Sequence, residues 1–280
     1  MFGRRGGMTY GAPQRGVPGG GRIVAVWGPT GSPGRSTVAA ALAGALADVG
    51  RVVLVDADLQ RGALDVLLGA DVGGNVASAS RFPAPSGFSC PPDHLFAHRA
   101  GFALLPGVPG PGQGVTVQPD DLAALLERLR LAFDLVVVDV GWALPAHEHG
   151  RSHLAALQAA ALVLVVAAAT RLGIADLLLQ YPVLAEHLCA SDGHGPATWC
   201  VLNNGNGAHM ESQRRRITDE TGLWVASYVP HDCAAVTRAH ERCLPLTVTR
   251  RDSPASRVLW TLAERIWQAP AGQRMVSTPP

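Results

Sequence analysis

The chain has 280 residues, of which 48% are hydrophobic and 16% are charged, and its formal net charge at pH 7 is +1. This length suffices for one large α/β domain or two small ones with a sizeable apolar core. A net charge this close to zero argues against a partner that is held mainly by electrostatic attraction. All 23 of the lysine and arginine residues are arginines, so every long cationic side chain is a guanidinium.

The composition also bears on the compartment. The five cysteines are scattered without a C-x-x-C pair, which is typical of reduced thiols in a cytosolic protein. The stretch before Arg22 lacks the apolar segment of a secretion signal, and no uninterrupted apolar run reaches the roughly 18 residues of a spanning helix. We therefore expect a cytoplasmic protein with disordered tails at residues 1–21 and 269–280 and a single folded domain over residues 22–268.

The most informative stretch is 22–37, RIVAVWGPTGSPGRST, which indicates a buried strand, a glycine-rich bend and the first turn of a helix. Gly28, Gly31 and Gly34 punctuate the bend, and the helix is expected to end near Gly50. At such a junction the loop amides point inward, and the helix dipole adds about half a positive charge. This geometry binds nucleotide phosphates. The alternative is the helix-entry turn of an ordinary α/β domain.

The same stretch departs from the Walker A consensus GxxxxGK[ST]. Pro29 stands at the position of the first consensus glycine, and Arg35 stands at the position of the lysine. The loop alone therefore does not establish a nucleotide site, and the acidic residues that follow must support it.

Two later strands lead to acidic residues. The strand 52–55 leads to Asp56 and Asp58, and the run 135–139 (LVVVD) carries Asp139 at its tip. Ligands of parallel α/β sheets bind at the carboxyl ends of the strands, so these carboxylates can face a metal–phosphate centre. The alternative for Asp56 and Asp58 is a helix N-cap and a surface acid, and for Asp139 an ordinary buried strand.

Three connecting segments are less specific. Residues 70–100 form a long polar stretch without clear periodicity. Residues 171–188 are mostly helical, and Pro182 is expected to kink or split that helix. The H-x-H-x₃-H spacing of residues 147–153 could bind zinc, but it lacks a matched carboxylate or cysteine, so we expect ordinary loop histidines.

The last two strands also end in polar residues. The segment 198–204 (TWCVLNN) ends with Asn203 and its neighbour, whose amides suit an adenine edge or an Asn-Gly turn equally well. The strand 223–229 is closed by residues 230–232. The arginines at 214–216 lie on a short helix and are interpreted as a solvated face rather than as a phosphate-binding patch.

About seven strands alternate with helices along the chain, with no internal repeat. This alternation predicts an α/β fold with three layers, in which a doubly wound, mostly parallel sheet lies between helices.

The motifs occur in a specific order: phosphate loop, D-x-D strand end, LPG strand, VVVD strand, LNN strand and VPHD strand end. This order resembles the ParA/MinD superfamily of deviant-Walker P-loop ATPases over residues 22–268. Within the superfamily, the chain looks most like the CpaE/TadZ-type pilus-assembly and septum-site proteins of bacteria. The resemblance implies a P-loop NTPase that binds ATP and Mg²⁺ and positions a cellular machine.

The resemblance also implies residue roles. Arg35 would reach the β- and γ-phosphates, and Asp58 would position the attacking water, which makes these two the candidate catalytic residues. The Ser36 hydroxyl would ligate Mg²⁺, while Asp56 and Asp139 would hold its waters. The candidate nucleotide-binding residues are Gly31, Ser32, Pro33, Gly34, Arg35, Ser36, Thr37, Asn203, Pro230 and Asp232.

Three departures from the family pattern weaken this expectation. The signature lysine that reaches across an ATP-bound dimer falls at Thr30, which cannot supply its charge. The fork of Arg35 is bulkier than an ammonium, and Pro33 removes one loop N–H. We therefore expect retained but weakened nucleotide binding and slow or absent ATP hydrolysis.

The implied partners are a second copy of the chain, bound in a nucleotide-dependent dimer, and a protein of a pilus, division or partition system. Such a partner would recruit the protein to a pole or a membrane. Two alternatives are a non-enzymatic localisation scaffold with a degenerate nucleotide site, and a partition ATPase that binds DNA nonspecifically. The near-neutral charge disfavours the DNA alternative, and the absence of C-x-x-C disfavours a metal-cluster carrier.

Overall fold

The computed structural model describes residues 20–31, 33–60, 62–71, 73–82, 90, 92–110, 116–142, 144–188, 195–207 and 209–269. The tails expected at residues 1–21 and 269–280 lie almost entirely outside the described residues, so both expectations remain predictions. Among the described residues, no helix combines the length and the apolarity that crossing a membrane requires.

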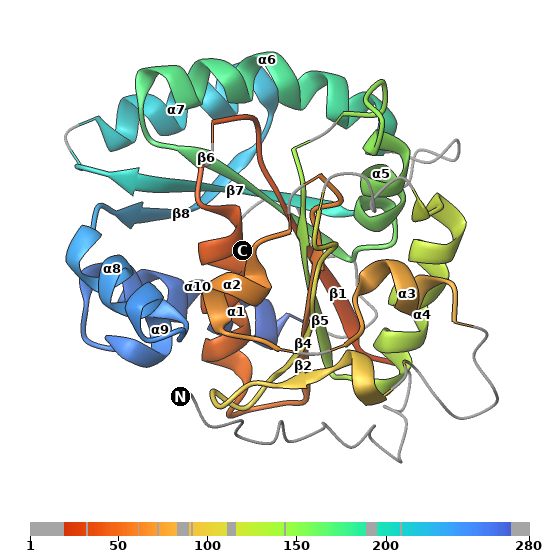
Figure 1. Cartoon of the computed structure of the whole chain (residues 1–280). Helices are drawn as coiled ribbons and strands as arrows, with labels where there is room; N and C mark the ends of the chain where they lie inside the picture. Colours follow the sequence, from red (N-terminus) through yellow and green to blue (C-terminus); the bar gives the residue numbers. More distant parts are fainter. Residues whose placement is uncertain are drawn as a thin grey trace.

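One eight-stranded sheet with the order β3-β4-β2-β5-β1-β6-β7-β8 organises the described part of the chain (Figure 1). Neighbouring strands run parallel, except that β3 pairs antiparallel with β4. The doubly wound, mostly parallel α/β fold is therefore confirmed, with one short edge strand beyond the about seven expected. The strands are β1 (Arg22–Trp27), β2 (Val52–Ala57), β3 (Phe96–Ala97), β4 (Ala103–Leu105), β5 (Leu135–Val140), β6 (Leu162–Ala168), β7 (Ala197–Gly205) and β8 (Trp224–Pro230).

The strands at the centre of the sheet are apolar on both sides because helices cover both faces. Every residue of β2 and β5 is buried, and β1 is buried from its second residue onward. The parallel register pairs Val26 of β1 with Asp139 of β5, and Asp139 in turn with Asp56 of β2. The acidic strand ends therefore lie side by side, next to the end of β1 from which the glycine-rich loop departs.

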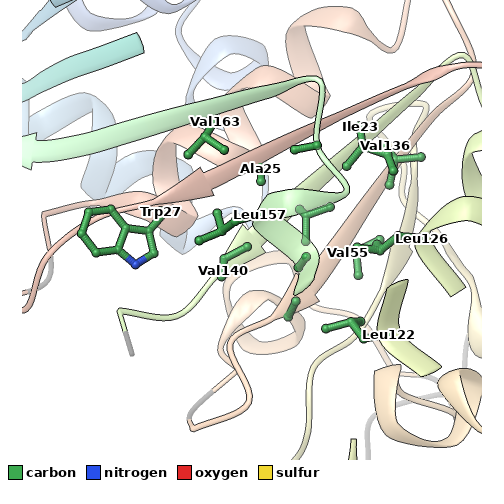
Figure 2. Close-up of a cluster of buried hydrophobic side chains, with 14 of the residues drawn as sticks. Ile23, Ala25, Trp27, Val55, Leu122, Leu126, Val136, Val140, Leu157 and Val163 are labelled. Atoms are coloured by element: carbon green, nitrogen blue, oxygen red, sulfur yellow. The ribbon is translucent and has the colours of Figure 1, made fainter. Parts of the chain in front are cut away.

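Helices form a layer on each face of the sheet (Figure 1). Each layer packs on one of two hydrophobic clusters. One cluster lies under α3 to α7 and contains the large ring of Trp27, which Figure 2 shows at the end of β1. The other lies under α1, α2 and α8 to α10. The helices are α1 (Arg35–Leu46), α2 (Leu64–Leu68), α3 (Val76–Ser80), α4 (Pro119–Ala132), α5 (Gly150–Gln158), α6 (Arg171–Leu188), α7 (Met210–Thr221), α8 (Cys233–Glu241), α9 (Leu246–Thr249) and α10 (Pro254–Gln268), with a short 3₁₀ turn at Pro92–His94.

Two local expectations need correction. The stretch 70–100 is not a plain loop, because a capping box between Asn75 and Ser78 starts α3, and β3 adds a strand to the sheet edge. The helix over 171–188 is not split at Pro182. Pro182 is exposed, and the neighbouring Tyr181 and Leu184 are buried, so packing against the sheet holds the helix together on both sides of the proline.

Candidate functional site

The loop between β1 and α1 has the conformation that its glycines suggested. Gly34 has a φ of +93° and caps α1, whose first helical hydrogen bond runs from the Val38 N–H to the Gly34 carbonyl over 3.0 Å. An L residue rarely adopts such a φ, so glycine is required here. A cavity of about 250 Å³ lies at this helix start and is lined by Gly34, Arg35, Ser36 and Thr37. Ser32 lies outside the described residues.

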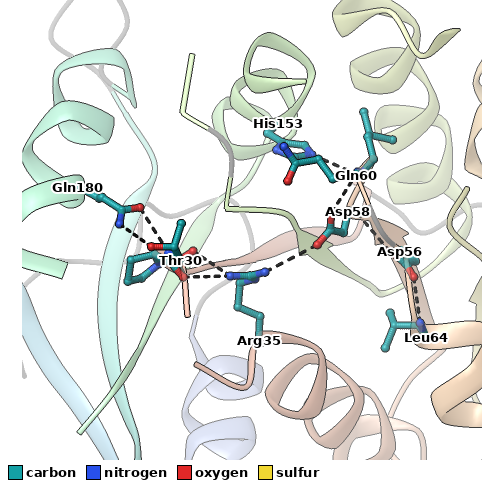
Figure 3. Close-up of polar contacts among 11 residues, drawn as sticks. Thr30, Arg35, Asp56, Asp58, Gln60, Leu64, His153 and Gln180 are labelled. Carbon is teal, nitrogen blue, oxygen red and sulfur yellow. Dashed lines mark hydrogen bonds and ion pairs between the residues drawn. The ribbon is translucent and has the colours of Figure 1, made fainter. Parts of the chain in front are cut away.

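Arg35 folds back across the loop (Figure 3). Its Nη1 donates to the carbonyl oxygens of Gly28 and Pro29, both over 3.1 Å, and its Nη2 lies 3.7 Å from Oδ2 of Asp58. The Arg35 and Asp58 side chains are only 12% and 16% exposed. The two candidate catalytic residues are thus brought together, and the planar fork of arginine allows these contacts at once.

Two further side chains brace the loop from outside. The Asn203 Nδ2 of β7 donates to the Pro33 carbonyl over 2.8 Å. Gln180 of α6 accepts from the Thr30 N–H over 3.4 Å and donates to the Thr30 hydroxyl over 3.0 Å. Nothing in the sequence around Gln180 indicated this contact. Thr30, which stands at the position of the signature lysine, is therefore held within the same chain.

Asp56 and Asp139 form a buried pair of carboxylates. Asp56 is fully buried and Asp139 is 2% exposed. Burial raises the pKa of Asp56 well above its usual range, and the neighbouring Asp139 charge adds to the shift. Burial also raises the pKa of Asp139 to about 7, although a hydrogen bond with the Ser36 side chain opposes the shift.

The carboxylates of Asp56 and Asp139 differ in their hydrogen-bond partners. Asp56 accepts backbone N–H groups on both oxygens, from Asp58 over 3.2 Å and from Leu64 over 3.0 Å. The Oδ1 of Asp139, in contrast, is buried and has no hydrogen-bond partner among the described residues. An orphaned carboxylate oxygen beside a serine hydroxyl fits a cation such as Mg²⁺, which binds one or two carboxylates together with water and phosphate oxygens. Asp139 and Ser36 are therefore better placed for a metal than Asp56.

A second cavity, of about 260 Å³, lies between the loop and the ends of β7 and β8. It has the size for a nucleoside and contains the predicted residues Pro33, Gly34, Thr37, Asn203, Pro230 and Asp232. Its other wall is apolar and comes from α8, α9 and α10, including Val236, Leu246 and Leu259. Sequence reasoning missed this wall because its residues show the same periodicity as ordinary core residues.

The remaining candidates of the sequence do not form sites of their own. His149 precedes α5 as its N-cap and His153 lies on α5, and both are buried; the described residues contain no group of three side chains that could hold a metal ion, so zinc binding is unsupported. The three arginines of α7 are exposed but pair with acids of the same helix, Arg214 and Arg215 with Glu211, and Arg216 with Glu220.

Comparisons with known proteins place this geometry in context. No protein-family model matches the chain. The antiactivator FleN of Pseudomonas aeruginosa is 27% identical over 267 residues, which cover 90% of this chain and 89% of FleN. The septum site-determining protein MinD of Pyrococcus horikoshii, solved with Mg-ADP, has a TM-score of 0.71 and 19% identity, covering 90% of this chain and 97% of MinD. A ParA family ATPase of Chlorobium tepidum has a TM-score of 0.72 and 18% identity, covering 87% and 98%.

The chain has the MinD/ParA fold. The resemblance that the motif order predicted is thereby confirmed at the level of the fold. The finer likeness to CpaE/TadZ-type proteins stays a prediction. In this MinD/ParA fold, the glycine-rich loop, the buried carboxylates and the nucleoside-sized cavity all lie at one rim of the sheet.

Proposed function

We propose that the chain binds ATP with Mg²⁺ at the rim formed by the loop, Asp139 and the cavity beside β7. The observation that carries the proposal is that a phosphate-sized hollow and a nucleoside-sized hollow share Gly34 and Thr37 in their walls. The N–H groups of Gly31 and of residues 34–37 would bind the phosphates, and the apolar wall would cover the base. The Pyrococcus horikoshii structure with Mg-ADP supports this choice of ligand for the fold.

Ser36 and Asp139 would hold the metal, with Asp56 supporting from the second carboxylate. Bound Mg²⁺ would neutralise charge that develops on the phosphates. Arg35 would keep a positive charge at the loop, and Asp58 would orient a water. Because Arg35 and Asp58 are paired with one another, both must leave that pairing before they act. We therefore propose slow ATP hydrolysis, well below the roughly 1–100 s⁻¹ of kinases.

At the cellular level, we propose that the protein positions a larger assembly, as a pilus, division or partition factor that acts with a protein partner. FleN is named an antiactivator, and one solved neighbour is a MinC:MinD complex, which supports a function exerted through a protein partner. A nucleotide-dependent homodimer remains part of the proposal, although Thr30 offers no charge to a second copy. We place the protein in the cytoplasm, recruited to a pole or membrane by its partner.

A second candidate is a non-enzymatic localisation scaffold on the same fold. The observation that favours it is the set of contacts of Arg35, which is satisfied by two loop carbonyls and by Asp58. Such a loop is stable without phosphate and would keep nucleotide only as a structural ligand, or not at all. Nonspecific DNA partition has no such support, because the α7 arginines are paired.

ATP turnover and binding of a fluorescent ADP separate these candidates. Arg35→Ala is expected to weaken ADP binding at least about tenfold, because the loop loses its cationic side chain. Arg35→Lys keeps the charge, and its affinity for ADP should stay within about threefold of the wild type. Asp58→Ala should abolish turnover and leave ADP affinity nearly unchanged. Arg130→Ala, on α4, where the guanidinium is half-buried and pairs with Glu127 of the same helix, serves as the control.

The outcomes are distinct. ADP binding without turnover in the wild type selects the scaffold. Turnover that neither Arg35→Ala nor Asp58→Ala alters removes the catalytic assignment. A wild type that binds no nucleotide contradicts the proposed ATP site and leaves only a scaffold that has lost its ligand.

A further inference from the structure

The segment that carries Asp58 is held by three consecutive backbone N–H groups. The Asp58 N–H donates to Asp56 Oδ1 and the Gln60 N–H donates to Asp58 Oδ1, each over 3.2 Å. Both of these contacts are local turns within the segment. The N–H between them, that of Leu59, donates to Nε2 of His153 over 3.4 Å (Figure 3). This bond spans 94 residues and ties the segment to α5.

His153 is fully buried, and so is Leu59. For Nε2 to accept this hydrogen bond, that nitrogen of His153 must be unprotonated. A buried peptide N–H needs a partner, and the His153 side chain on α5 provides one for Leu59.

Gly141, two residues after Asp139, lies against the same contact. A Cβ at Gly141 would come within 2.5 Å of His153 Cε1 and 2.8 Å of Asp58 Oδ1. The imidazole and the Asp58 carboxylate therefore flank one backbone position. The segment after β2 and the segment after β5 meet at this point. Because the packing is tight, a displacement of one segment requires the other to move as well.

We propose that His153 is a positioning residue for Asp58, which it acts on through the Leu59 N–H, and that with Gly141 it links the Asp58 segment to the segment after Asp139. This inference rests on the proposed function, in which Asp58 orients the water that attacks ATP. It adds a residue that contacts neither phosphate nor metal. His153 is thus not the ordinary loop histidine that the sequence led us to expect, because it is buried on α5.

Three variants test the proposal. His153→Leu keeps an apolar side chain of moderate volume but removes the acceptor. His153→Gln places an amide oxygen near the former Nε2 and so restores the acceptor. His149→Leu removes the other buried histidine of this region, whose ring centre lies 6.4 Å from that of His153. No hydrogen bond between the His149 ring and residues 56–60 occurs among the described contacts, so it is the matched control.

The first readout does not depend on activity. Hydrogen–deuterium exchange of peptides covering residues 57–61 should be about three- to tenfold faster in His153→Leu, consistent with the loss of one hydrogen bond, and near wild type in the other two variants. The second readout separates binding from chemistry. The kcat for ATP should fall about fivefold or more in His153→Leu with ADP affinity within about twofold, and His153→Gln should restore kcat.

Equal exchange in His153→Leu and the wild type would overturn the inference, as would a kcat loss that His153→Gln does not rescue or that His149→Leu reproduces. Wild-type protein that binds ADP but hydrolyses no ATP also overturns it and leaves nucleotide binding intact. Failure of the wild type to bind ADP contradicts the proposed function instead. The exchange data alone then decide whether His153 holds the segment that carries Asp58. If thermal denaturation shows His153→Gln to be unfolded, the comparison of His153→Leu with His149→Leu by hydrogen–deuterium exchange decides the inference: faster exchange at residues 57–61 in His153→Leu alone supports it, and equal exchange in the two variants overturns it.

Discussion

At the scale of single residues, the paired acids Asp56 and Asp139 set the chemistry of the rim. Two ionised carboxylates side by side in a buried site repel each other and lose hydration, so the nucleotide-free protein favours their protonated forms. A bound cation would favour the ionised forms instead. Binding of Mg²⁺ with nucleotide should therefore release protons, and the protein without ligand should become less stable at a pH high enough to ionise both acids.

The first consequence concerns pH. Folding lowers the pKa of most carboxyl groups that gain a partner, but it raises the pKa of Asp139 from 3.8 to about 7. Between these values the folded protein binds more protons than the unfolded chain, so stability should decrease as pH rises from about 4 to about 7 and should level off above. Asp139→Asn should reduce this slope and, at pH 8, unfold at a higher denaturant concentration than the wild type.

Urea denaturation between pH 5 and 8 measures the effect, since the midpoint follows stability when the slope m is constant. The wild type and Asp139→Asn are compared at each pH, so that contributions from histidines cancel in the difference. A constant difference across the range would contradict the raised pKa of Asp139.

Gly34 makes a prediction about the loop itself. Its φ of +93° is unfavourable for any L residue, and a Cβ would lie 2.3 Å from Nδ2 of Asn203. Gly34→Ala should therefore push Asn203 away from Pro33 and weaken ADP binding at least about tenfold. Gly73→Ala is the control, because a Cβ there has open space around it. If the two variants bind ADP equally, the loop does not form the phosphate site.

At the scale of elements, α7 shows how a basic motif can be neutralised by its own helix. Arg214 and Arg215 lie 2.9 and 2.8 Å from Glu211, and Arg216 lies 2.8 Å from Glu220. Exposed pairs such as these add little stability, but they leave little net charge for a phosphate backbone.

We therefore expect the wild type to bind duplex DNA weakly, with a shallow dependence on salt. Glu211→Gln unmasks two guanidinium groups and should steepen the plot of log K against log salt by about one to two units. Fluorescence anisotropy between 50 and 200 mM salt is the measurement. Tight wild-type binding that falls steeply with salt would favour the DNA-partition function instead.

The same scale explains what could be predicted from sequence. Strand ends of a parallel sheet meet at one edge, so the motifs alone placed Gly34, Asp56 and Asp139 together. In contrast, the contacts of Gln180 with Thr30 and of His153 with Leu59 depend on how α6 and α5 are rotated against the sheet. Local periodicity does not specify that rotation, and a buried histidine or a half-buried glutamine looks ordinary in the sequence.

At the scale of the whole molecule, the layered α/β plan was readable because long apolar runs alternate with helical segments. The edge strand β3 was missed because it has only two residues, Phe96 and Ala97, and lies within a stretch without periodicity. The apolar wall of the nucleoside cavity was also missed, since Leu246 and Leu259 serve the core and the cavity at the same time.

The residues that line the nucleoside-sized cavity determine at which stage of synthesis the cavity can form. Pro33 and Gly34 follow β1, the first strand described, whereas Leu259 lies on α10, the last helix described. A ribosome releases the loop long before it releases this helix, and chains generally fold as they emerge. The growing polypeptide therefore lacks this wall of the cavity until α10 has been made, so we expect nucleotide capture to follow the synthesis of that helix.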